Sequence, residues 1–174
     1  EQPMARRRED WRVGYFSTPA TIFNDHQQKV ERTNYITRWR LVPSDTVAYM
    51  RGELTEPVQP IVFYIGGAVP EHLRPYIFKG IEDWNKAFER AGFKNAIKAV
   101  IPADTLDIDG DDMRYSVLTY AASEKANAMG PSTIDPRTGE ILEADIIWWH
   151  NVQSLISEWI TVQTGAIDPR ARSL

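Results

Sequence analysis

The sequence predicts a mixed α/β fold whose sheet is mostly parallel, with an antiparallel strand at one edge. Three features predict it: a β-rich N-terminal region, two apolar runs separated by a helical pattern, and a turn that joins two strand-like segments near residue 135. A helix between two strands usually makes them parallel, whereas a short turn makes them antiparallel. The 174 residues suit one compact domain. We divide the chain into a β-rich N-terminal arm, residues 1–60, and a main unit, residues 61–174.

The N-terminal arm is rich in β-branched and aromatic residues, which predicts strands at Val13–Phe16 and Tyr35–Val42. Alternation along the second strand would put its apolar residues on one face: Tyr35, Thr37, Trp39 and Leu41. Arg38 and Arg40 would then face water or a partner. The run Arg6–Arg8 is followed at once by two acidic residues, so we interpret it as a solvated charged turn.

The main unit begins with the apolar run Ile61–Ile65, which predicts a buried strand. A helical pattern over Pro75–Ala91 follows, with Trp84 on its apolar face. Gly92 suits a left-handed cap at the end of that helix. The apolar residues of Ala96–Ile101 then predict a second strand.

The C-terminal half predicts a third strand at Tyr115–Ala121, followed by a hairpin. The hairpin joins Gly130–Ile134 to Glu140–Trp149 through the turn at Asp135–Gly139. Proline cannot donate to a sheet ladder, so Pro131 predicts that the first arm is an exposed edge strand. A final helix should start at the capping residue Asn151 and end near Gly165.

Composition excludes several classes of function. The net charge is −4, with 20 basic against 24 acidic residues, so no basic field favours nucleic acid. The sequence shows no apolar run of the ~18 residues that a bilayer crossing needs, so we expect no membrane span. The absence of cysteine excludes disulfides, thiolate metal sites and cysteine nucleophiles.

The residues that could carry chemistry are few. His26, His72 and His150 lack the spacing of a local metal site, and isolated histidines are more often surface or capping residues. Convergence of the three, or a hydrolytic site that pairs His150 with a carboxylate, remains an alternative. The acidic loop Asp107–Asp112 offers oxygen ligands for calcium. Its glycine, however, is at the fourth position, and Leu118 stands at the twelfth, where an EF-hand has glutamate, which favours a solvated turn.

Several long segments carry a family resemblance: Val13–Phe16, Tyr35–Leu41, Gly80–Phe88, Arg114–Val117, Gly130–Ile147 and Gln163–Arg172. Together they resemble the bacterial metzincin-like zinc-dependent metalloproteases of the Bacteroidetes type. The resemblance implies the upper part of a catalytic domain, with a twisted, mostly parallel sheet, an antiparallel edge strand and one long backing helix. It also implies peptide-bond hydrolysis in a secreted, periplasmic or cell-envelope protein.

In that family, the edge strand forms the ceiling of a cleft and binds an extended peptide substrate. The matching residues here are Met129, Gly130, Pro131, Ser132 and Thr133. The family's H-E-x-x-H segment supplies zinc ligands and the glutamate base, and it is not present in this sequence. We therefore expect that segment after Leu174 in a parent protein, with zinc bound there. We expect no catalytic residue and no zinc ligand in this chain, which would be inactive alone and would pack against the remainder of its own catalytic domain.

A second function fits the same features. The exposed edge strand could belong to a noncatalytic module that binds a peptide or a protein partner without any chemistry. A histidine–glutamate helix downstream of this sequence would favour the protease, and its absence would favour the binding module.

Overall fold

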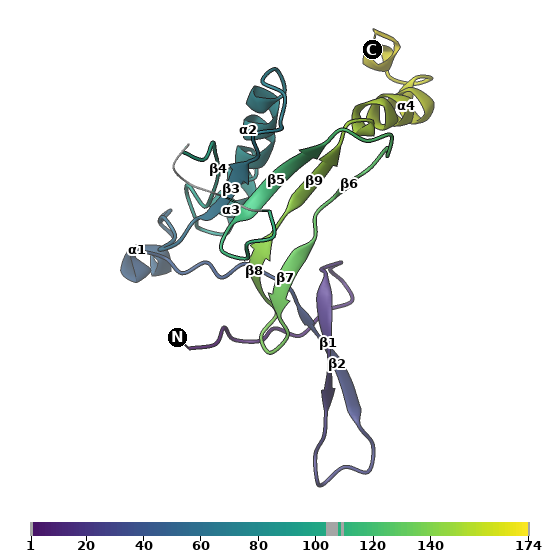
Figure 1. The fold of residues 1–174 in the computed structure, drawn as a ribbon. Helices are drawn as coiled ribbons and strands as arrows, with labels where there is room; N and C mark the ends of the chain where they lie inside the picture. The colour runs from purple at the N-terminus through teal and green to yellow at the C-terminus, as the bar shows by residue number, and fades with distance from the viewer. Residues whose placement is uncertain (1, 104–107, 109, 174) are drawn as a thin grey trace. The chain divides into compact units, whose positions relative to one another are not determined.

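The chain has a mixed α/β fold in a computed structural model that describes residues 2–103, 108 and 110–173 (Figure 1). It divides into two compact units, each assembled from segments that are separate in sequence. The first unit consists of residues 1–61, 83–98 and 132–144. The second unit consists of residues 62–82, 99–131 and 145–174.

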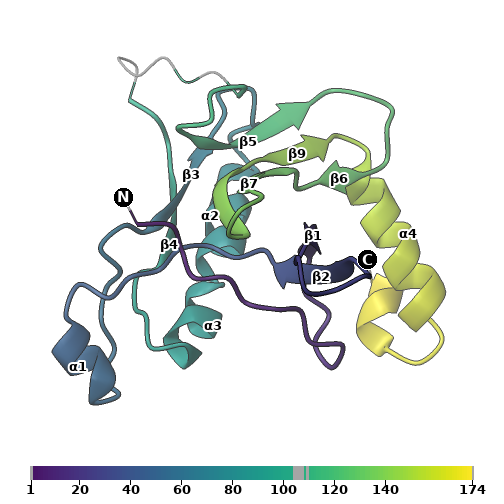
Figure 2. The same cartoon turned by 90° about the horizontal axis from the view of Figure 1, so that it is seen from below.

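A five-stranded sheet has the strand order β4-β3-β5-β9-β6. Its strands are β3 (Ile61–Ile65), β4 (Ile97–Val100), β5 (Ser116–Ala121), β6 (Ala128–Met129) and β9 (Ile146–Trp149). β5 is parallel to β3 and β9, whereas β6 is antiparallel to β9. Figure 2 shows β5, β9 and β6 side by side. The predicted mostly parallel sheet with an antiparallel edge strand is confirmed.

Apolar burial is deepest around β3 and β5. Ile65 and Leu118 are paired in register and are each 2% exposed, and Val69 is buried just beyond β3. A carboxylate extends the pairing of β5 with β9, because Asp145 Oδ1 accepts the Val117 N–H at 2.8 Å. This side chain satisfies a backbone donor that lies before the first paired residues of the two strands.

In the first unit, β1 (Ser17–Ile22) pairs antiparallel with β2 (Glu31–Ile36). The N-terminal segment lies along the other side of β2, where the Glu9 N–H donates to Asn34 and the Ile36 N–H donates to Arg7. Beyond β2 the chain changes partner, and the Arg38 N–H donates to the Gly139 carbonyl at 2.9 Å.

The strands predicted for the N-terminal arm are therefore wrong in their bounds. Residues Val13–Phe16 lie outside any strand and are exposed, and β2 ends at Ile36 instead of continuing to Val42. Tyr35 and Ile36 are both buried, so the predicted alternation fails there. Partners on both sides of β2, and not the local pattern, decide where the strand ends.

The predicted helix Pro75–Ala91 is wrong as a single element. It is divided into α2 (Arg74–Glu82) and α3 (Asn85–Arg90). The Asn85 side chain donates to the Ile97 carbonyl at 2.8 Å and accepts the Ala96 N–H at 2.9 Å, which ties the start of α3 to β4. Trp84 is 63% exposed, so the prediction that it packs in the core is also wrong.

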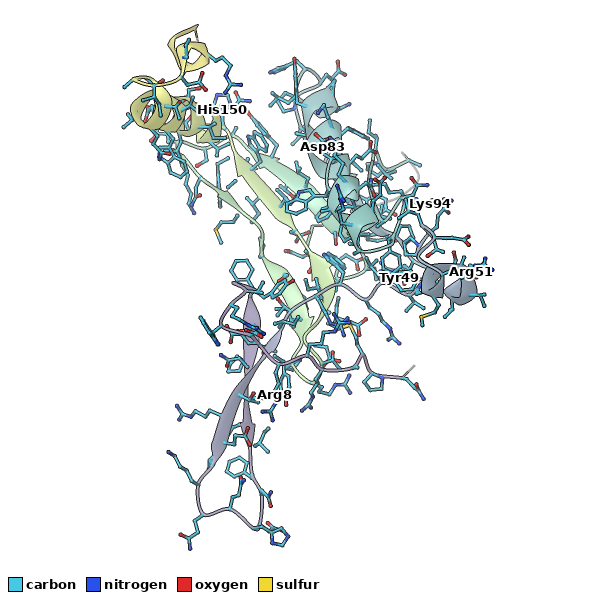
Figure 3. The ribbon with its side chains drawn as sticks, turned by 180° about the vertical axis from the view of Figure 1, so that it is seen from behind. Arg8, Tyr49, Arg51, Asp83, Lys94 and His150 are labelled. Carbon is cyan, nitrogen blue, oxygen red and sulfur yellow. The ribbon has the colours of Figure 1, made fainter. Side chains whose placement is uncertain are left out.

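The end of α3 follows the sequence prediction. Gly92 has φ +91°, the left-handed conformation expected of the cap, and Phe93 is buried. The Tyr49 hydroxyl donates to the Ala91 carbonyl at 3.0 Å, and the Tyr49 ring packs against Phe93 with centroids 5.2 Å apart. Tyr49 comes from the short helix α1 (Thr46–Met50), and Figure 3 labels Tyr49 together with Arg51, which follows the helix.

The predicted turn at Asp135–Gly139 is confirmed. It joins β7 (Ser132–Asp135) to β8 (Glu140–Ala144) in an antiparallel pair. Gly139 has φ +77°, and a Cβ built there would overlap the Ile36 carbonyl oxygen. The turn therefore needs glycine both for its backbone angle and for its close contact with β2.

The C-terminal helix α4 (Val152–Thr164) has the predicted extent and is followed by the 3₁₀ helix η1 (Pro169–Ser173). Asn151 lies at the N-cap position, but its side chain donates to the Glu124 carbonyl and does not cap the helix. Val152 is the only buried residue among those described in α4. Every helix in the described part of the chain falls short of the length and apolar content required for a bilayer crossing.

The same local interaction occurs in four turns, where an aspartate binds the arginine two positions later. The pairs are Asp10 with Arg12, Asp112 with Arg114, Asp135 with Arg137, and Asp168 with Arg170. In each, the carboxylate accepts both the backbone N–H and the guanidinium of the arginine, for example at 3.0 and 2.9 Å in the second pair. The interaction satisfies turn amides with a charged acceptor.

Replacing Gly139 with alanine should lower the free energy of unfolding by about 2–4 kcal/mol, because the left-handed angle and the overlap with Ile36 both oppose a side chain. Gly52→Ala is the matched control, since Gly52 has φ +83° but open space around it and should cost only about 1 kcal/mol. Urea denaturation measures both. Equal losses would show that the contact with Ile36 is not tight.

The Asp112 carboxyl should titrate well below a free aspartate. Hydrogen bonds from Arg114 lower its pKa from 3.8 to about 2. Because the folded pKa is depressed, the stabilisation is fully present above pH 4 and is lost as the pH falls through about 2. NMR titration should show that Arg114→Gln raises this pKa toward 3.8, whereas Arg12→Gln leaves it unchanged. An Asp112 pKa near 3.8 in the unmodified chain would contradict the contact.

Candidate functional site

The exposed edge of the five-stranded sheet consists of β6 and the two residues that follow it, Ala128–Pro131; we call it the β6 edge. Ala128 faces Trp148 and Met129 faces Ile147. Two further hydrogen bonds extend this register, from the Trp149 N–H to Asn127 at 3.4 Å and from the Asp145 N–H to Pro131 at 3.0 Å.

The direction of the backbone hydrogen bonds alternates along the β6 edge, and this determines which groups could bond to another strand. In an antiparallel ladder, residues that bond to the neighbouring strand alternate with residues whose N–H and C=O point away. Asn127, Met129 and Pro131 bond toward β9, so the backbone groups of Ala128 and Gly130 point outward. All four residues of the β6 edge are exposed.

One outward donor is already satisfied, because the Asn127 side chain accepts the Ala128 N–H at 2.8 Å. The remaining outward groups are the Ala128 carbonyl and both backbone groups of Gly130. These three groups can form hydrogen bonds with one short extended segment. A longer segment could also bond to the Ala128 N–H only after the Asn127 side chain releases it. Pro131 then limits the edge in the other direction.

The five residues that the resemblance assigns to substrate binding do not lie on one strand. Met129 belongs to β6, and Gly130 and Pro131 follow it. Ser132 and Thr133 belong to β7, which pairs with β8 in the first unit. The predicted edge strand Gly130–Ile134 is therefore not one strand: Gly130 and Pro131 follow β6, and the rest belongs to β7.

His150 lies beside the start of α4 (Figure 3). Its Nδ1 pairs with the Tyr120 hydroxyl, and the two rings are perpendicular with centroids 6.1 Å apart. Next to His150 in the sequence, the Trp149 ring has the Lys125 ammonium 4.0 Å from its centroid. The alternative of a hydrolytic site at His150 with a carboxylate gains no support, because the bonded partner is a phenol.

Sequence reasoning missed Tyr120 and Lys125. Tyr120 reaches His150 because β5 and β9 end together, with Ala121 paired to Trp149 and the His150 N–H bonded to Ala121 at 3.0 Å. Only the strand register brings these residues together, and no short motif in the sequence indicates it.

Side chains that could ligate a metal do not gather in the described part of the chain. Across residues 2–103, 108 and 110–173, no group of three or more His, Asp or Glu side chains could hold a metal ion. The alternative that His26, His72 and His150 converge on a metal ion therefore gains no support. The acidic loop remains untested, because Asp107 and Asp109 lie outside the described residues.

Comparison with protein families finds one match over the N-terminal region. Residues 1–44 match the family described as "Domain of unknown function (DUF5117)". The matched residues contain β1 and β2 and do not reach the β6 edge. No curated protein and no solved structure matches the chain.

Hydrogen exchange tests the geometry of the β6 edge. In dilute solution the outward Gly130 amide should exchange much faster than the amide of Phe63, which lies in β3 with paired strands on both sides. Met129, which bonds toward β9, should be slower than Gly130. Equal protection of Gly130 and Phe63 in a monomer would show that another segment covers the edge.

Proposed function

We propose that this chain contributes a substrate-binding edge to a zinc-dependent metalloendopeptidase. The β6 edge would hold an extended peptide by strand addition, as the ceiling of the cleft. Peptide-bond hydrolysis would occur in the parent protein. The observation that carries the proposal is the exposed, antiparallel β6 edge with outward backbone groups at Ala128 and Gly130.

Strand addition suits this edge on chemical grounds. A peptide that pairs with a sheet gains affinity from main-chain hydrogen bonds, which any sequence except proline can make. Gly130 offers a donor and an acceptor without a side chain to hinder approach, and the Ala128 carbonyl adds a second acceptor. A short edge of this kind fits a transient substrate better than a permanent partner, because few hydrogen bonds hold it.

The zinc chemistry would belong to the remainder of the catalytic domain. Zinc would activate water there, and its ligands and the glutamate base would come from the H-E-x-x-H segment that the resemblance implies. The described residues of this chain would orient the peptide and would not take part in the chemical step. We further propose that the parent protein is secreted or resides in the periplasm or cell envelope.

The exposed apolar residues of α4 support a contact with that remainder. Ile156, Trp159 and Ile160 are spaced by one helical turn, and Trp159 is 57% exposed. Glu158 is the one charged residue in the helix. An apolar helix face of this kind is costly to leave in water, so we propose that the rest of the catalytic domain covers it.

A noncatalytic peptide- or protein-binding module is the second candidate, because the β6 edge alone would suffice for it. The two candidates differ in the full-length protein. Stoichiometric zinc and chelator-sensitive peptide hydrolysis would support the protease, whereas peptide binding without zinc or hydrolysis would support the module.

Gly130→Pro should weaken peptide binding to this chain by about five- to tenfold, because it removes one outward N–H and the hydrogen bond that it donates. Gly130→Ala is the matched control, since a Cβ there would lie 3.8 Å from the Asp145 carbonyl oxygen, an ordinary contact. Binding of a capped, uncharged peptide of alternating valine and threonine can be followed by NMR.

The unmodified chain and Gly130→Ala should bind this peptide equally, with new protection of the Gly130 amide. If Gly130→Pro binds as tightly as both, the peptide does not use the β6 edge. The proposed role of Ala128–Pro131 would then be wrong, even if the parent protein hydrolyses peptides.

A further inference from the structure

Three segments of the first unit that are distant in sequence bring arginines together. The N-terminal segment lies along β2, where Figure 3 labels Arg8, and the chain after β2 lies along the turn before β8. These segments supply Arg8, which lies 3.4 Å from Glu31, and five further arginines. We call these five the arginine patch: Arg6, Arg7, Arg38, Arg40 and Arg137.

Contacts hold several of these arginines against the neighbouring segments. The Arg6 guanidinium donates to the Arg137 carbonyl and stacks over the Tyr35 ring, 5.1 Å from its centroid. Arg38 donates from Nη2 to the Ala5 carbonyl at 2.7 Å. Arg7 lies close enough to Arg38 for their charges to repel.

Carboxylates neutralise only part of this charge. Arg137 is paired with Asp135 at 2.9 Å, and Arg40 lies 3.8 Å from Glu140. Within the described part of the chain, Arg6, Arg7 and Arg38 form no ion pair. The patch therefore carries more positive charge than its own carboxylates balance.

Arg38 is the most constrained member. Its Nε is buried and has no hydrogen-bond partner among the described residues. Burial lowers the pKa of Arg38 below its usual range, the charge of Arg7 lowers it further, and Glu140 acts in the opposite direction. A desolvated guanidinium beside a second cation is unfavourable unless an anion is nearby.

We propose that the arginine patch is a binding site for an oxyanion, a phosphate or a carboxylate that accepts hydrogen bonds from the Arg7 and Arg38 region. All five cations are arginines, and the planar guanidinium is suited to paired hydrogen bonds with such anions, whereas an ammonium is a point charge. The site is independent of the β6 edge and its proposed function. The oxyanion can be free in solution or carried by an acidic peptide.

Arg7 provides the sharpest test, because its side chain makes no hydrogen bond or ion pair that the fold needs. Without oxyanion and at low salt, Arg7→Gln should raise the melting temperature by about 1–2 °C, since it removes the repulsion of Arg38. With inorganic phosphate at constant ionic strength, the same change should weaken binding by about three- to tenfold.

Arg90→Gln is the charge-matched control. Arg90 lies on exposed α3 in the same unit, and its replacement should alter neither the melting temperature nor phosphate binding. Arg7→Lys keeps the charge and should preserve part of the affinity, which separates charge from guanidinium geometry.

Binding is measured with two probes, inorganic phosphate and capped tetraglutamate, on the whole chain. Saturable stabilisation by either probe that Arg7→Gln reduces supports the site. If only phosphate stabilises the chain, the ligand is a free oxyanion; if only tetraglutamate does, the ligand is a carboxylate on a polypeptide. Chloride that stabilises as much as both probes at equal ionic strength would show screening only and would overturn the proposal. An equal response of Arg7→Gln and Arg90→Gln would also overturn it.

Discussion

The pairing of β9 on both of its sides determines the arrangement of the second unit. β5 bonds to one side of β9 in parallel and β6 to the other side antiparallel, so the backbone of β9 is used in both directions. Asp145 extends the first pairing with its side chain and the second with its backbone N–H. Because β9 has a partner on each side, the outward groups of the β6 edge that have no partner among the described residues are the Ala128 carbonyl and the N–H and C=O of Gly130. Another strand could therefore add at the β6 edge.

A comparable constraint operates in the first unit, where β2 has a partner on each side. β1 pairs with one side, and the N-terminal segment bonds to the other through Arg7 and Glu9. Gly139 lies in close contact with Ile36, and the residues after Ile36 bond to Gly139 and Ile141 beside the turn before β8. This arrangement half-buries Arg38, which a surface strand would have left in water.

The two proposed sites rely on different chemistry. The β6 edge offers neutral backbone groups, which recognise an extended chain with little regard to its side chains. The arginine patch offers unbalanced charge and guanidinium planes, which recognise an oxyanion with little regard to the rest of the ligand. Salt should weaken the second interaction far more than the first, because screening acts on exposed charges.

The sequence by itself determined the elements that depend on neighbours along the chain. The strand Ile61–Ile65, the turn Asp135–Gly139 and the left-handed Gly92 follow from local apolar runs and glycine positions. The tertiary structure decided features that depend on distant partners. Asn85 bonds to β4 and helps to define a helix start that the 3.6-residue pattern does not show, and the predicted edge strand divides after Pro131. The arginine patch likewise joins three remote segments. Local propensity cannot encode these outcomes, because hydrogen bonds and burial between remote residues form only when the chain is folded.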